Sequence, residues 1–261
     1  LDALDGIDLL AVAGTKPPVA FFAYPDTPGE LTPDGVPRLD LGGPETDSAA
    51  TLSKIADLMG ASQSATSPAP ASRDVDLTLD KFSPHTIGGV IAAHLPENAI
   101  VSDDGVTASL PIFLQTAGAA RHEWLALMGG AIGQGMPVAI GAAIAAPDSK
   151  ILCLTGDGAG MYTNQALWTM ARERLDIVTI VFVNHAYRIL NIELQRTGAG
   201  AAGAAAQGLL NLGKPEIDWE ALARAMGVEA ACANDLAGLD AALRKALTTP
   251  GPHLIAVQLP G

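Results

Sequence analysis

The amino-acid sequence predicts an α/β fold, with a doubly wound, mostly parallel sheet that has helices on both faces and is preceded by part of a second α/β domain. Three observations support this prediction. Helix-like and strand-like segments alternate regularly from residue 80 onward. Residues 177–183 form an unbroken apolar or β-branched run, which is typical of a parallel strand buried on both faces. A hydrophobic content of 49% in 261 residues is enough for a large core.

The chain divides into three segments by composition. Residues 1–60 form a short α/β segment, with an apolar strand at 7–13 and a helix around 46–59. Residues 61–79 include a stretch of small and polar side chains punctuated by proline, which contains too little apolar surface to fold, so we expect a linker there. Residues 80–261 form the main domain.

The main domain opens with a helix start signal. Ser83 followed by Pro84 predicts an N-cap with proline at the first helical position, and the helix extends to about Leu95. The Ala/Gly-rich residues 198–208 have no side chains able to anchor them, so we expect a mobile loop there. The remaining pattern predicts strands at 99–102, 150–155, 177–183 and 253–257, and helices at 135–146, 163–174, 218–226 and 235–247.

Charge and composition exclude several classes of function. Fifteen basic and 28 acidic residues give a net charge of −13, which repels nucleic acid and anionic membrane surfaces. The sequence has neither a long apolar run nor a signal-peptide pattern at its start. Cys153 and Cys232 each lie in an apolar run, which suits buried thiols in a reducing compartment. We therefore expect a cytoplasmic protein.

A glycine-rich turn follows the strand at 150–155. Gly156, Asp157, Gly158, Ala159 and Gly160 stand where this strand ends and a helix begins, a position at which backbone N–H groups bind phosphate. A dinucleotide-binding oxidoreductase is a weaker interpretation, because the third glycine of that fingerprint is absent and an acid stands in the turn. A carboxylate beside phosphate is repulsive unless a cation lies between them.

The next strand supplies a partner for this acid. Asn184 ends the strand at 177–183, 27 residues after Asp157, so neighbouring parallel strands place both side chains at one sheet edge. Their oxygens suit a hard divalent ion, and Mg²⁺ bridging a diphosphate is the natural occupant. Taken singly, Asp157 could be a helix N-cap and Asn184 a turn residue. The pairing favours the metal site.

These residues resemble the thiamine-diphosphate enzymes, whose motif is Gly-Asp-Gly followed at this distance by Asn-Asn. The resemblance extends over most of residues 80–261. Residues 95–100 and 156–169 are similar to the benzoylformate decarboxylase and acetolactate synthase branch, and residues 129–135 and 190–196 to acetolactate synthase large-subunit homologues.

The resemblance implies a set of cofactor ligands. Mg²⁺ would be bound by the Asp157 carboxylate, the Asn184 side chain and the Ala186 carbonyl. The diphosphate would be held at the Gly156 turn by the backbone N–H groups of Gly158 and Ala159 and by the Thr107 hydroxyl. Separately from the resemblance, Tyr187 and His185 directly follow the strand that carries Asn184, and either could face the cofactor.

The resemblance also implies two catalytic positions. The Gly130 carbonyl would accept a hydrogen bond from the cofactor's 4′-amino group, and Ile132 would hold the cofactor bent, so that its aminopyrimidine lies against the thiazolium carbon. The implied reaction is decarboxylation of a pyruvate-like 2-oxo acid followed by carboligation, as in acetolactate synthase, in a homodimer or homotetramer.

Several features depart from the family pattern. Val183 replaces the first Asn of the usual pair, and the bulky His185 follows Asn184 and could narrow the site. The pyrimidine-binding domain, whose glutamate protonates the cofactor ring, does not correspond to any of these residues. The chain is therefore expected to be the carboxyl-terminal half of a three-domain subunit, with residues 1–60 from the middle domain. FAD contacts that middle domain and is left unassigned.

Two alternatives stay open: a simple 2-oxo acid decarboxylase, and a non-catalytic cofactor-binding subunit. Benzoylformate decarboxylase carries a catalytic histidine where residues 19–24 are apolar, which argues against its reaction. Of the other histidines, His122 is either a solvated loop residue or a substrate contact, and His85 and His94 are expected at the surface.

Overall fold

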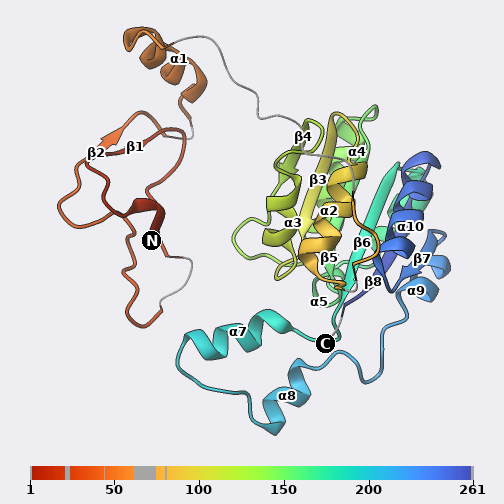
Figure 1. The fold of residues 1–261 in the computed structure, drawn as a ribbon. Coiled ribbons are helices and arrows are strands. Elements are labelled where there is room, and N and C mark those ends of the chain that lie inside the picture. The colour runs from red at the N-terminus through yellow and green to blue at the C-terminus, as the bar shows by residue number, and fades with distance from the viewer. Residues whose placement is uncertain (1, 21–23, 44, 62–74, 80, 260–261) are drawn as a thin grey trace. The chain divides into compact units, whose positions relative to one another are not determined.

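The computed structural model describes residues 2–20, 24–43, 45–61, 75–79 and 81–259, and the chain separates into two compact units (Figure 1). The smaller unit combines the amino-terminal segment with Ile192–Ala201, and the larger unit holds the rest. Residues 62–74 of the predicted linker lie outside the described residues.

The smaller unit contains few regular elements. Strands β1 (Leu10–Val12) and β2 (Arg38–Asp40) pair in parallel after a short 3-10 helix, η1 (Asp2–Leu4). Helix α1 (Ser48–Leu58) begins after Asp47, whose side chain accepts a hydrogen bond from the Ala50 N–H at 2.9 Å. The predicted helix at 46–59 is confirmed, whereas the predicted strand at 7–13 is shorter, because Val12 alone is buried among the described residues of this unit.

The larger unit is built on a six-stranded parallel sheet with the order β4-β3-β5-β6-β8-β7. The chain passes from β3 outward to β4 and then returns to β5 on the other side of β3, so the direction of winding reverses between β3 and β5. The strands are β3 (Ala99–Asp104), β4 (His122–Leu125), β5 (Ile151–Gly156), β6 (Ile177–Val183), β7 (Glu229–Ala233) and β8 (His253–Gln258).

Helices cover both faces of this sheet, which confirms the predicted doubly wound fold. Leu152 and Leu154 of β5 lie in one core cluster with α2, α3 and α10, and Ile151 and Cys153 lie in the other with α4, α6 and α9. The helices of this part are α2 (Pro84–His94), α3 (Ser109–Thr116), α4 (Gly135–Ala145), α5 (Asp157–Gly160), α6 (Ala166–Glu173), α8 (Ala204–Leu210), α9 (Trp219–Ala225) and α10 (Leu236–Thr248). Helix α7 (Arg188–Arg196) begins in this unit and ends in the smaller one.

Helix boundaries follow the predicted caps in most cases. Ser83 and Thr86 form a reciprocal capping box at α2, and the Asp235 side chain accepts from the Gly238 N–H at 2.7 Å. The helix predicted at 163–174 begins only at Ala166, because the Thr163 hydroxyl donates instead to the Gly133 carbonyl.

Two predictions about surface segments were wrong in part. The expected mobile loop at 198–208 runs into α8 from Ala204, where three consecutive alanines favour a helix. His94 is half-buried rather than exposed, and its Nε2 lies 2.6 Å from Asp240 Oδ1 because α2 packs against α10. His85 is exposed as predicted.

The two cysteines differ in exposure. Cys153 is buried as predicted, whereas Cys232 is partly exposed. Both thiols are free. Within the described ranges, every helix is too short or too polar to cross a lipid bilayer.

Candidate functional site

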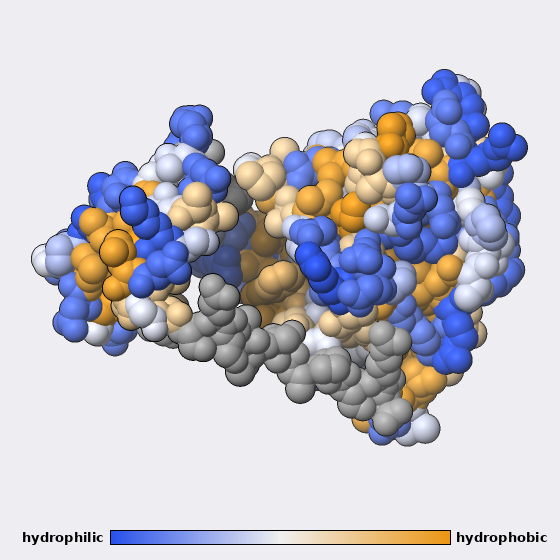
Figure 2. All heavy atoms as spheres, turned by 90° about the horizontal axis from the view of Figure 1, so that it is seen from above, coloured by the Kyte–Doolittle hydropathy of each residue, from blue (hydrophilic) through white to orange (hydrophobic). Residues whose placement is uncertain are grey.

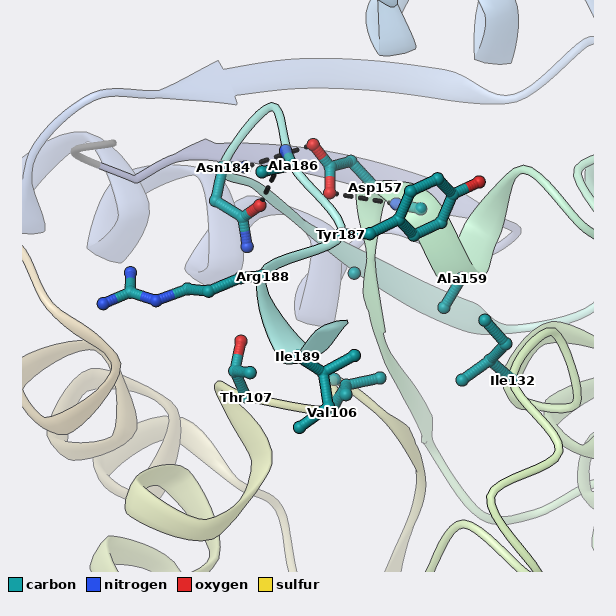
Figure 3. A pocket seen from close by; sticks show the side chains of 13 residues that line it. Val106, Thr107, Ile132, Asp157, Ala159, Asn184, Ala186, Tyr187, Arg188 and Ile189 are labelled. Carbon is teal, nitrogen blue, oxygen red and sulfur yellow. Dashed lines mark hydrogen bonds between the residues drawn. The ribbon is translucent and has the colours of Figure 1, made fainter. Parts of the chain in front are cut away.

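A pocket lies at the carboxyl ends of β3, β5 and β6 (Figure 3). The turns that follow these three strands line it, together with Ile132 from the turn before α4. In open α/β sheets, ligands bind at this edge where the strand order reverses, which here is between β3 and β5. The fold therefore marks this pocket as the candidate site.

The pocket brings together all the predicted site residues except Gly130. Gly130 is exposed, and its carbonyl accepts a hydrogen bond from the Ile132 N–H at 2.9 Å. The residues brought together are Thr107, Ile132, Gly156, Asp157, Gly158, Ala159, Asn184, Ala186 and Tyr187, and the lining also includes Gly105, Val106, Arg188 and Ile189, which the sequence analysis missed.

Asp157 is held by three backbone donors (Figure 3). Its Oδ1 accepts from the Gly158 N–H at 2.9 Å, and its Oδ2 accepts from the N–H groups of Asn184 and His185 at 3.2 and 2.7 Å. Burial raises the pKa of Asp157, and these hydrogen bonds oppose the rise. Since a carboxylate offers about four acceptor positions, one on Oδ1 remains for a cation.

Asn184 and Ala186 place two further oxygens in this turn. Asn184 Oδ1 accepts from the Ala186 N–H at 3.0 Å and keeps a second acceptor position. Ala186 forms an isolated antiparallel bridge with Asn211, whose two hydrogen bonds are made by the flanking residues His185 and Tyr187. That pattern turns the Ala186 carbonyl away from Asn211 and leaves it unused by the bridge.

The oxygen ligands offered by Asp157, Asn184 and Ala186 suit Mg²⁺ bound together with a diphosphate. One carboxylate, one amide and one carbonyl are hard oxygen ligands, and Mg²⁺ is usually bound by one or two carboxylates plus phosphate oxygens. Across the described ranges no group of three or more His, Cys, Asp or Glu side chains could hold a metal by itself. A metal at Asp157 would therefore take its other ligands from amide and carbonyl oxygens, from water or from a bound phosphate.

Neither His185 nor His122 lines the pocket. His185 has a φ of +56°, which is unusual for a residue with a side chain, and its Nε2 lies 3.8 Å from Glu216 Oε1. The expectation that it narrows the site was therefore wrong. His122 Nδ1 bonds instead to the Ala120 carbonyl at 2.7 Å.

Two adjacent aspartates at the end of β3 hold two walls of the pocket. Asp103 Oδ1 accepts from the Gly105 N–H at 3.0 Å and from the Ser109 hydroxyl at 2.6 Å, which fixes the turn that carries Thr107. Asp104 Oδ2 accepts from the N–H groups of Gly133 and Gly135 at 2.8 and 3.2 Å, which fixes the turn just after Ile132. The sequence analysis missed both side chains, although two acids ending a buried strand were a usable signal.

Asp104 is also an unusual buried acid. Its second oxygen, Oδ1, is buried and has no partner among the described residues. Burial raises the pKa of Asp104 to about 6, and the neighbouring Asp103 adds to the rise. Above that pH, the hydrogen bonds from Gly133 and Gly135 stabilise the buried negative charge of Asp104, while Oδ1 stays without a partner among the described residues.

Comparison with known proteins identifies the class. Residues 112–257, more than half of the chain, match the family described as thiamine pyrophosphate enzyme, C-terminal TPP binding domain. The chain belongs to this family, which confirms the predicted resemblance.

Its relatives include acetolactate synthases and decarboxylases. The chain is 43% identical over 258 residues to IlvX of Mycobacterium tuberculosis, a protein named after the acetolactate synthase large subunit, covering 98% of this chain and 50% of IlvX. It is 30% identical over 182 residues to the acetolactate synthase isozyme 1 large subunit of Escherichia coli, covering 69% of this chain and 31% of that protein.

A solved structure of a thiamine diphosphate-dependent decarboxylase has a similar fold. The thiamine diphosphate-dependent 4-hydroxybenzoylformate decarboxylase of Rhodococcus jostii RHA1 matches with a TM-score of 0.76 and 25% identity, over 99% of this chain and 50% of that one. The chain thus spans about half the length of this structure and of IlvX.

Proposed function

We propose that this chain binds thiamine diphosphate through Mg²⁺ and serves in the decarboxylation of a pyruvate-like 2-oxo acid with carboligation, as an acetolactate synthase-like lyase or transferase. One observation carries the proposal: Asp157, Asn184 and Ala186 lie in one pocket at the carboxyl edge of the sheet, in the turns after β5 and β6. Membership of the thiamine pyrophosphate family supports it.

One end of the pocket would bind the metal and the diphosphate, and the other would hold the reacting end of the cofactor. Asp157, Asn184 and Ala186 would hold the metal, while the Gly158 and Ala159 N–H groups and the Thr107 hydroxyl would bind the diphosphate. At the other end Ile132 would keep the cofactor bent. The bound cofactor would supply the electron sink that loss of CO₂ requires.

Gly130 would act through its backbone carbonyl. This oxygen already accepts from the Ile132 N–H, and a carbonyl has a second acceptor position that could receive the cofactor's amino group. The Asp104 carboxylate fixes the turn immediately after Ile132. This would hold the Gly130 carbonyl and the Ile132 side chain in place for the same cofactor molecule.

The choice of reaction rests on the relatives. The names of the first relatives favour carboligation, whereas the name of the Rhodococcus protein favours simple decarboxylation. A non-catalytic cofactor-binding subunit is the third candidate, and the Val183 replacement favours it. Chromatography of the products that this chain forms from pyruvate together with the proposed missing half separates these: acetolactate, acetaldehyde or neither.

We further propose that residues 1–60 come from a middle domain, and that a pyrimidine-binding domain completes the active site in a cytoplasmic homodimer or homotetramer. Hydrophobic residues, drawn in orange, reach the surface in Figure 2. The larger unit exposes large side chains that a partner could cover, including Met128, Tyr162 and Trp168 at 72%, 58% and 53% exposure. FAD stays unassigned. Light scattering on the complete subunit, which is this chain with the proposed missing half, should give the mass of at least two subunits. The mass of a single subunit would contradict the proposal.

Calorimetric titration tests the cofactor proposal. Thiamine diphosphate should bind the chain in the presence of Mg²⁺ and much more weakly after chelation, because the metal would neutralise the repulsion between Asp157 and the diphosphate. Equal affinity with and without the metal would overturn the proposal. The 261 residues alone should not convert pyruvate, because the activating glutamate would come from the other domain.

Gly158→Ala is expected to weaken Mg²⁺-dependent binding of thiamine diphosphate by roughly 10-fold, because the added Cβ would lie 2.6 Å from Tyr187 Cε1 and displace the ring or the turn. Gly141→Ala is the control, since nothing lies within 4 Å of a Cβ at that position on α4. Equal affinities of the two variants, measured by calorimetry, would contradict the close packing of Tyr187 on the diphosphate turn.

A further inference from the structure

The pocket contains one basic side chain that has no role so far, Arg188. Arg188 is the first residue of α7 and lines the same pocket as Asp157, Asn184 and Thr107. In Figure 3 its guanidinium extends past Asn184, on the side of the pocket away from Ile132. Its side chain is exposed. An exposed cation therefore stands on the side of the pocket that carries Asn184 and Thr107.

Arg188 differs from most arginines of this chain in having no partner among the described residues. The chain carries 28 acidic residues and a net charge of −13, so acidic partners are plentiful. Arginines that do form ion pairs with acidic side chains are Arg38, Arg172, Arg196, Arg224 and Arg244. An unpaired guanidinium at the edge of a pocket is available to an anionic ligand.

The charges at this end of the pocket leave room for such a cation. A diphosphate together with the Asp157 carboxylate carries more negative charge than one divalent ion neutralises. The planar guanidinium can donate two parallel hydrogen bonds to one phosphate group, and it stays charged at every relevant pH. A substrate carboxylate is a less fitting ligand, because the reacting end of the cofactor is assigned to the Ile132 side.

We infer that Arg188 binds the terminal phosphate of thiamine diphosphate and so acts as a second cation beside Mg²⁺. This inference rests on the proposed function, since it assumes that the diphosphate occupies this pocket.

Calorimetry with three ligands tests the inference. Arg188→Gln is expected to weaken binding of thiamine diphosphate and of inorganic diphosphate, each with Mg²⁺, by about 10-fold, whereas Arg188→Lys should retain much of the affinity. Thiamine monophosphate, which lacks the terminal phosphate, should bind the wild type and Arg188→Gln equally. Arg172→Gln removes the same charge from the exposed face of α6 and should change none of these affinities.

The outcomes separate this inference from the proposed function. If Asp157→Asn abolishes Mg²⁺-dependent binding while Arg188→Gln leaves it unchanged, the inference on Arg188 is wrong and the site stands. If Arg188→Gln weakens the monophosphate as strongly as the diphosphate, a contact with the terminal phosphate is excluded. If the wild type binds thiamine diphosphate without any dependence on Mg²⁺, both fail.

Discussion

Asp157→Asn is expected to weaken Mg²⁺-dependent binding of thiamine diphosphate by more than about 100-fold, the upper range seen when residues that only support a metal ligand are replaced. The substitution keeps the shape of the side chain but removes the negative charge that the metal requires. Its amide oxygen can still accept from the Asn184 and His185 N–H groups, whereas its NH₂ would face the Gly158 N–H, so the turn should keep two of its three hydrogen bonds. Calorimetry of the purified variant measures the loss.

The fold of this variant should survive. Burial raises the pKa of Asp157, which means that the ionised carboxylate is disfavoured in the metal-free protein, so its neutralisation should not unfold the chain. Circular dichroism and thermal unfolding provide the check. Wild-type affinity in a folded Asp157→Asn protein would rule out this carboxylate as the metal ligand.

Asp104 is expected to make the protein less stable as pH rises. The pKa of Asp104 is about 6 in the folded protein, compared with 3.8 for an aspartate in the unfolded chain. Between pH 4 and 6 the folded state therefore binds more protons at this residue than the unfolded state does. The free energy of unfolding should therefore fall across this range, by up to about 3 kcal/mol for a shift of this size. The stabilisation is present below pH 4 and lost above pH 6.

Asp104→Asn tests this assignment by urea unfolding at a series of pH values. The side chain at position 104 cannot ionise in this variant. The fall in unfolding free energy between pH 4 and 6 should therefore become less steep, by an amount that corresponds to at most one bound proton. Asp157 contributes a slope of the same sign, because its pKa is also raised, and that part should remain. An unchanged slope in Asp104→Asn would show that Asp104 titrates normally.

The sheet was largely predictable because its central strands are buried on both faces. The run at residues 177–183 matches β6 at both ends, since seven consecutive buried residues leave no other arrangement. The edge strands escaped prediction. β4 (His122–Leu125) alternates between half-buried and exposed residues over only four positions, and β7 (Glu229–Ala233) contains three alanines, which favour helices when taken alone.

The site was predictable only where chemistry and strand spacing coincide. Asp157 and Asn184 follow neighbouring strands, and their spacing alone indicated that they meet. The roles of Arg188 and Asp104 could not be assigned this way, because they depend on turn geometry and side-chain direction, even though two acids at the end of a buried strand marked Asp104 as a candidate. The carboxylate of Asp104 reaches Gly133 and Gly135, 29 and 31 residues away, through a turn whose path no local pattern specifies.

A crystal structure of this chain with thiamine diphosphate and Mn²⁺, which is visible by anomalous scattering, tests the metal site most directly. The ion should lie at coordination distance from the Asp157 carboxylate, the Asn184 side-chain oxygen and the Ala186 carbonyl, with diphosphate oxygens completing its shell. An ion bound elsewhere, or a diphosphate seated without contact to Asp157 and Asn184, would contradict the proposed site.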